Sequence, residues 1–77
     1  MESLIEELTA ILEDDGMPKN VRNKIEIAIS ALEDCSIEES LRANKAIREL
    51  DDVSDDPNMP SYIRSQLWVI ISQLESL

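Results

Sequence analysis

The chain contains no histidine and no phenylalanine, and its 77 residues include a single cysteine and a single glycine. Without histidine there is no Ser-His-Asp triad, no histidine metal ligand and no imidazole proton relay. One cysteine allows neither an internal disulfide nor a cysteine-rich zinc site. One glycine cannot build a dinucleotide- or phosphate-binding fingerprint. These absences predict that the protein is not an enzyme and carries no cofactor.

Positive charge is also scarce. Seven Lys and Arg residues stand against seventeen Asp and Glu residues, which gives a net charge of −10. Nucleic-acid binding gains most of its affinity from neutralising phosphates, and anionic membrane surfaces repel acidic proteins. The charge therefore excludes nucleic acid and membranes as partners and leaves an unknown protein partner as the expectation.

Long apolar runs are missing as well. The longest run covers residues 67–71, which is far too short to cross a bilayer. The N-terminal residues show no positive start followed by a long apolar stretch, as a signal peptide would. The sequence thus predicts a cytoplasmic protein, and a lone cysteine fits a reducing compartment. Leu, Ile and Val number 22 of the 77 residues, above the share of roughly 20% below which a highly charged chain stays disordered, so we expect residues 1–77 to form a single folded domain.

An internal repeat organises the chain. Residues 17–33 match residues 59–75 at an offset of 42 positions, and the match continues upstream without a gap. Paired positions include Met17 and Met59, Pro18 and Pro60, Arg22 and Arg64, and Asp14 and Asp56. Amphipathic helices resemble one another, but amphipathicity does not require the Met-Pro pair or the following arginine. We therefore expect one repeat at about 1–34 and a second at about 37–77.

Apolar residues recur with helical spacing in four segments. The first predicted helix covers residues 2 to about 14, the second begins near Pro18, the third follows residue 36, and the fourth begins near Pro60. Ser36 and Glu39 have the spacing of a capping box at the start of the third helix. No segment alternates with the period of a strand. The predicted fold is all-α, an antiparallel four-helix bundle built from two repeated helical hairpins.

The segment Pro18-Lys19-Asn20-Val21-Arg22, the acidic turn before it, and the repeated Pro60-Ser61-Tyr62-Ile63-Arg64 carry a family resemblance. Through them the chain resembles a family of small acidic archaeal proteins of uncharacterised function. The resemblance covers almost the whole chain and implies a four-helix bundle made by duplication of a helical hairpin. It implies no activity, ligand or catalytic residue. Tyr62 stands where the first repeat has Asn20, so the second copy is the looser match.

Acidic residues cluster in the turns, with Asp14 and Asp56 at matching positions. Clustered carboxylates can hold Ca²⁺ or Mg²⁺, but the alternating acids, central glycine and distal glutamate of a calcium loop are missing, so no metal site is predicted. Arg22 and Arg64 lie one turn inside the following helices and are predicted to form structural salt bridges with these acids. Weak cation binding and an acidic site for a partner are the alternatives for the turns. A phosphate or carboxylate ligand is the alternative for the arginines.

Two polar residues fall at unusual places. Asn44 lies on the predicted apolar stripe of the third helix, between Leu41 and Ile47. It is expected to fix the register of that helix, and lining a ligand cavity is the alternative.

Cys35 has acids on both sides and no histidine base in the chain, so it is interpreted as an ordinary loop or half-buried cysteine rather than a nucleophile.

Four apolar residues lie outside the predicted stripes: Ile27, Tyr62, Trp68 and Val69. Either neighbouring helices cover them or they form an exposed patch for a partner. Trp and Tyr are typical interface anchors, so these residues are the candidate interface. A second copy of the chain could also use them. We expect a weak homodimer that strengthens with ionic strength, because salt screens the repulsion between two acidic copies.

The favoured function is a non-catalytic protein–protein interaction module of the archaeal cytosol. The alternative is an acidic inhibitor or mimic that binds a basic nucleic-acid-binding partner. The net charge of −10 is the observation that supports this alternative. A carboxylate-based metalloenzyme is least favoured, because bundles of that class supply Glu-x-x-His motifs that this chain lacks.

Overall fold

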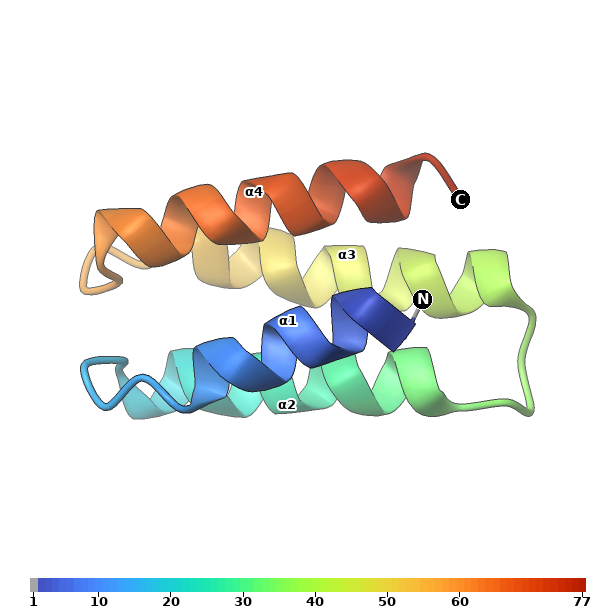
Figure 1. The fold of residues 1–77 in the computed structure, drawn as a ribbon, viewed down its shortest axis with the longest axis horizontal. Coiled ribbons are helices and arrows are strands. Elements are labelled where there is room, and N and C mark those ends of the chain that lie inside the picture. The colour runs from blue at the N-terminus through green and yellow to red at the C-terminus, as the bar shows by residue number, and fades with distance from the viewer. Residues whose placement is uncertain (1) are drawn as a thin grey trace.

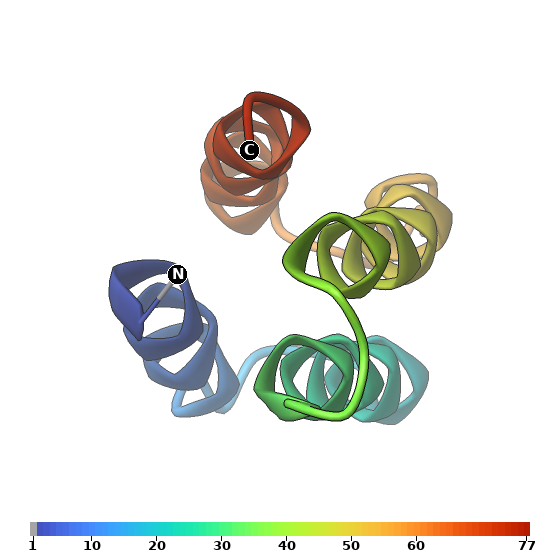
Figure 2. The same cartoon turned by 90° about the vertical axis from the view of Figure 1, so that its right-hand side faces the viewer.

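The computed structural model describes residues 2–77, which form four α-helices and no strand. The helices are α1 (Glu2–Leu12), α2 (Lys19–Glu33), α3 (Glu39–Ser54) and α4 (Ser61–Glu75). Consecutive helices run antiparallel, and the four surround one common core (Figures 1 and 2). The predicted all-α four-helix bundle is therefore confirmed. None of the helices in the described part of the chain is long and apolar enough to span a membrane.

Each helix buries one stripe of residues spaced three or four apart, as the periodicity predicts. The buried helical residues are Leu4, Leu8 and Ile11; Val21, Ile25, Ala28 and Leu32; Ala43, Ala46, Leu50 and Val53; and Ile63, Leu67, Ile70, Ile71 and Leu74. Together with Met17 and Met59 from the turns they form a single cluster. No polar or charged residue is buried within residues 2–77. Burying one of the Leu, Ile, Val or Met side chains stabilises the fold by about 1.5–3 kcal/mol, so this cluster holds the bundle together.

The three turns share one construction. In each, an aspartate that follows a helix accepts a hydrogen bond from the backbone N–H two residues later. The bonds run from Gly16 to Asp14 at 2.8 Å, from Ser36 to Asp34 at 3.0 Å, and from Asn58 to Asp56 at 2.8 Å. Such side-chain bonds hold the chain in a turn and stop the helix from continuing.

An arginine eight residues after each aspartate closes the end of the preceding helix. Its guanidinium donates to one backbone carbonyl in the last turn of that helix, which the helix leaves without a partner, and to one in the turn that follows. Arg22 donates to the carbonyls of Leu12 and Asp14, Arg42 to those of Leu32 and Ile37, and Arg64 to those of Ser54 and Asp56. The backbone N–H of each arginine also donates a hydrogen bond to the carbonyl of the residue that precedes the new helix, which is Pro18, Glu38 or Pro60. One arginine thus joins the end of one helix to the start of the next.

The predicted salt bridges of Arg22 with Asp14 and of Arg64 with Asp56 are wrong in their partners. The guanidinium groups bond to main-chain carbonyls, and the one salt bridge within residues 2–77 joins Lys24 and Asp52. The reason is competition for donors. A turn carboxylate can be hydrated and bonded by nearby N–H groups, whereas a helix-end carbonyl turned toward the protein needs a donor from the protein.

The middle turn differs from the prediction. Ser36 does not cap a helix: its hydroxyl bonds to Asp34, and α3 begins only at Glu39, behind Glu38. The capping box was therefore wrong. The same aspartate-to-arginine spacing that marks the other two turns, here from Asp34 to Arg42, is the signal that identifies this turn.

The predicted buried role of Asn44 is also wrong. Asn44 is exposed, and Leu41 beside it is 50% exposed. The stripe of α3 runs instead through Ala43 and Ala46 to Leu50. Leu41 lies two residues before Ala43, which turns it about 160° away from that stripe. The two alanines are less hydrophobic than Leu41, yet they are the residues of α3 that pack into the core here.

Candidate functional site

The offset of 42 residues that relates the repeats also relates two junctions between helices. α2 meets α3, and by the same relation α4 faces α1. α2 and α3 pack together more extensively than any other pair of helices. The small side chain of buried Ala28 lets α3 come close at this junction, whereas Ile70 occupies the matching position on α4. The two matched junctions are therefore not equivalent.

The α2–α3 junction is closed by polar side chains. Lys24 of α2 forms a salt bridge with Asp52 of α3, and the side-chain amide of Asn20 donates to Asp56 at 2.7 Å. The hydrogen bond to Asp52, together with the charges of Asp52 and Glu49, raises the pKa of Lys24 above its ordinary value of 10.5. The lysine therefore stays charged between two acids.

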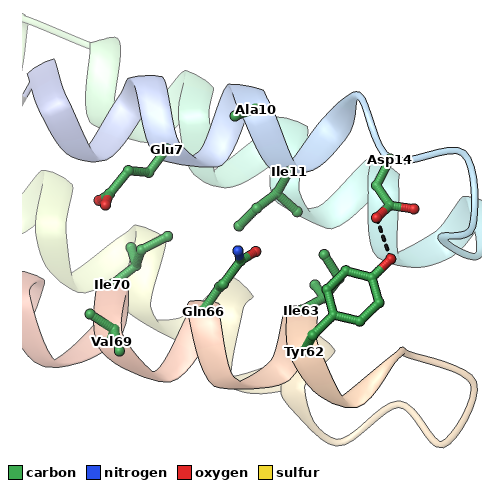
Figure 3. Close-up of a pocket in the computed structure, with 9 residues that line it drawn as sticks. All are labelled: Glu7, Ala10, Ile11, Asp14, Tyr62, Ile63, Gln66, Val69 and Ile70. Atoms are coloured by element: carbon green, nitrogen blue, oxygen red, sulfur yellow. Dashed lines mark hydrogen bonds between the residues drawn. The ribbon is translucent and has the colours of Figure 1, made fainter.

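At the matching positions of the other junction, Gln66 replaces Lys24 and Ala10 replaces Asp52. No salt bridge forms there within the described residues, and a groove of about 410 Å³ remains between α1 and α4. The lining residues, drawn in Figure 3, are Glu7, Ala10, Ile11 and Asp14 from α1 and the turn after it, and Tyr62, Ile63, Gln66, Val69 and Ile70 from α4. We call this surface the α1–α4 groove.

One polar pair spans the groove at its turn end. The hydroxyl of Tyr62 donates to the carboxylate of Asp14, in the position where Asn20 bonds to Asp56 in the other junction (Figure 3). This bond, with a further one from the Gly16 N–H, holds the pKa of Asp14 below its ordinary value of 3.8. The same bond raises the pKa of Tyr62 above 10.0. Asp14 therefore keeps its negative charge at the rim of the groove.

The floor and walls of the groove are mostly apolar. Ile11, Ile63 and Ile70 are buried members of the core, and Val69 stands exposed at the edge. Glu7 extends along the groove on the side of Ile70 (Figure 3). An apolar cleft with a few polar groups at its rim is the usual form of a binding site, and this one carries negative charge at its rim.

The four candidate interface residues are all exposed, at 53% for Ile27, 58% for Tyr62, 56% for Trp68 and 55% for Val69. They do not form one patch. Tyr62 and Val69 line the α1–α4 groove, whereas Ile27 lies in a shallow depression between α2 and α3. Trp68 does not line the groove; one position before Val69, it projects about 100° away around the helix.

Sequence reasoning missed the other groove residues, Glu7, Ala10 and Gln66. The signal that could have found them was the difference between the two repeats at these positions, where one helix faces the other.

The remaining titratable side chains do not form a candidate site. Cys35 is exposed, and its thiol lies 3.7 Å from the carbonyl of Glu33. In residues 2–77, no three Cys, Asp or Glu side chains come together in a way that could hold a metal ion.

The comparisons with known proteins agree with this architecture. A family model described as "Uncharacterised protein family (UPF0147)" matches residues 1–77. Among solved structures, the chain is similar to the unknown-function protein MMP1188, known from a crystal structure. The two are 39% identical, the match covers 99% of this chain and 86% of that one, and the TM-score is 0.94. No curated protein matches the chain. The family resemblance inferred from the sequence is thus confirmed: the chain belongs to the uncharacterised protein family UPF0147.

Proposed function

We propose that this protein is a non-catalytic interaction module that binds a positively charged segment of another protein in the α1–α4 groove. The observation that carries the proposal is the difference between two matched junctions. Lys24 and Asp52 close one of them, and their counterparts Gln66 and Ala10 leave the other open. A groove that is bridged by a salt bridge in its matched copy, and is left without one here, is a place that another chain can bind.

The sign of the partner follows from charge. The chain carries −10, and Glu7 and Asp14 stand at the groove. Complementary potentials speed association and exclude partners of the same sign. The exposed ring of Tyr62 and side chain of Val69 supply apolar contact, of the kind that dominates binding energy at interfaces.

A site-specific crosslinking experiment tests the proposal. A photoreactive amino acid is placed at Val69 and, in a second protein, at Ile27, which has the matching repeat position and nearly the same exposure. We expect the Val69 probe to capture one discrete protein from native extract and the Ile27 probe to miss it. The captured protein, once purified, should bind Val69→Ser at least about fivefold more weakly than Ile27→Ser, and neither substitution changes the charge. Equal capture at both positions, or equal loss in both variants, would contradict the proposal.

The acidic inhibitor or mimic stays as the second candidate, because α3 presents Asp51, Asp52 and Asp55 side by side around one surface depression. A partner that binds only through electrostatic attraction would lose affinity steeply with added salt. It would also bind equally well when Val69 is replaced, since that residue lies at a different junction. The dependence of affinity on salt and the Val69→Ser variant therefore separate the two candidates.

A further inference from the structure

We propose that the bound segment is an amphipathic helix and that one of its lysines or arginines takes, in the α1–α4 groove, the place that Lys24 takes between α2 and α3. This inference rests on the proposed function and specifies the chemistry of the partner. It is drawn from the protein's own closed junction, which serves as a template for the open one.

The template places a cation among acids. Lys24 bonds to Asp52 and is further attracted by Glu49. In the open groove Glu7 occupies the position of Glu49, so one of these acids is retained. The cation is not retained, because Gln66 is neutral. Within residues 2–77 no basic group forms a salt bridge with Glu7 or Asp14. The groove thus keeps negative charge at the place where the closed junction holds an ammonium group.

The space for an incoming side chain comes from Ala10. Its counterpart Asp52 carries a carboxylate that bonds to Lys24, whereas the Ala10 side chain ends at its methyl, and both Ala10 and Gln66 line the groove. Lysine and arginine bury their aliphatic stems on apolar surface and keep the charged end in water. The exposed side chains of Tyr62 and Val69 offer that apolar surface, and Glu7 offers a carboxylate in the same groove.

The secondary structure of the occupant follows from backbone chemistry. The groove is apolar between its rims and runs between two helices for about two turns, from Glu7 to Asp14. An extended segment would bring unpaired N–H and C=O groups against these walls, whereas a helix satisfies its own. A helix laid in a groove contacts it through residues spaced three and four apart. The partner should therefore carry its basic residue next to apolar residues at this spacing.

A second copy of this chain fits the groove less well. It brings another net charge of −10 to a rim that is already negative. Like charges brought together at an interface cost affinity. A basic helix from another protein gains from the same charge.

The test grafts the closed junction into the open groove. The double variant Ala10→Asp/Gln66→Lys copies the Lys24–Asp52 pair and leaves the net charge unchanged. Both positions are exposed, so the fold should be kept, and thermal unfolding should occur no earlier than in the wild type. The matched control is Lys24→Gln/Asp52→Ala, which opens the other junction and also conserves charge.

The probe is a fluorescently labelled synthetic peptide of leucine and lysine, about five turns long and amphipathic as a helix. Binding is measured by anisotropy at about 0.15 M salt, where distant charges are screened. We expect the control to bind it at least as tightly as the wild type, and the graft to bind at least about tenfold more weakly than the wild type. A scrambled peptide of the same composition should bind all three proteins weakly and equally.

Equal affinity of graft and wild type for the amphipathic peptide would overturn the inference, because charge alone would then account for binding. Displacement of the peptide by spermine at the same total charge would also overturn it, since a small cation would suffice. The proposed function fails by a different result, namely loss of the crosslinking difference between Val69 and Ile27. A captured partner that binds graft and wild type equally would leave the proposed function standing. It would refute the inference that a basic residue of the partner takes the place of Lys24.

Discussion

Tyr62 and Asp14 are separated by 48 residues in the chain, yet the tyrosine hydroxyl donates a hydrogen bond to the aspartate across the end of the α1–α4 groove. The matched pair at the α2–α3 junction, Asn20 and Asp56, makes the same connection with a shorter donor. Each hairpin therefore offers its turn aspartate to the other hairpin. The longer phenol spans the wider junction, which explains why the repeats differ at this position.

Removal of the tyrosine hydroxyl should change the titration of Asp14. We expect the carboxyl of Asp14 to titrate below 3.8 in the wild type and closer to it in Tyr62→Phe, because the hydrogen bond from Tyr62 is the main cause of the lowered pKa. Carbon-detected NMR of the carboxyl resonance measures this. In Asn20→Ala the pKa of Asp56 should rise less, since the backbone N–H of Asn58 contributes most there. Equal shifts in the two variants would contradict the assignment.

The same bond gives stability a defined dependence on pH. Because the pKa of Asp14 is lowered on folding, its contribution is present above the unfolded value and is lost as the pH falls through the folded value. In Tyr62→Phe this part of the acid dependence should shrink. Denaturant unfolding of both proteins between neutral pH and about pH 3 measures it. Parallel stability curves would show that the bond is not formed in solution.

Loss of a turn arginine should destabilise the bundle. Arg64→Met removes a charged donor from the carbonyls of Ser54 and Asp56, and we expect the free energy of unfolding to fall by about 1–3 kcal/mol. Arg64→Lys should recover only part of this, because an ammonium group lacks the fork that reaches two carbonyls. Urea unfolding followed by circular dichroism measures both. Arg48→Met, at an exposed position outside the turns, is the control and should change little.

Salt should stabilise the protein at neutral pH. Self-repulsion at a net charge of −10 opposes the compact state, and dissolved ions screen it. We expect the melting temperature to rise with sodium chloride at pH 7 and to become insensitive to salt near pH 4.1, where the net charge vanishes. Scanning calorimetry at both pH values decides this. A fall in melting temperature with salt at pH 7 would mean that the Lys24–Asp52 pair outweighs the overall repulsion.

Self-association is expected to be weak and to increase with salt. The exposed side chains of Trp68 and Val69 offer apolar surface to a second copy, and the charge of each copy resists it. Sedimentation equilibrium at low and high salt should show a monomer near 8.7 kDa in the first case and partial dimer in the second. Trp68→Ser should remove the dimer if that face mediates it, and Val69→Ser if the groove does. A monomer under all conditions would refute the prediction.

Periodicity was sufficient to predict the four helices, because the core depends on which residues recur at three and four positions. It failed at Asn44 and Leu41, where two alanines bury more completely than a leucine does. Alanine is a weak hydrophobic signal, but its small side chain permits the closest approach of two helices. Burial at such a contact depends on the neighbouring helix, which the sequence of one helix does not contain.

The groove depends on pairs of residues that lie far apart in the chain. Tyr62 and Val69 were identifiable because they are apolar and lie off the stripe. Ala10 and Gln66 are ordinary on a polar helix face and gain meaning only beside Asp52 and Lys24. The roles of the arginines were missed for a related reason, since a spacing rule cannot distinguish a carboxylate from a carbonyl in the same turn.

The shared construction of the three turns makes the bundle a ring of four helices with one link absent. The start of α1 and the end of α4 lie at the same end of the molecule as the turn between α2 and α3 (Figures 1 and 2). A copy of residues 34–38 inserted between Glu75 and Glu2 would supply the aspartate of the absent link, with Ile5 in the place that the arginine takes in the other three turns. The chain could then be opened within the original turn between α2 and α3. Such a circular permutant should fold to the same bundle, with the α1–α4 groove now lying inside a covalent hairpin.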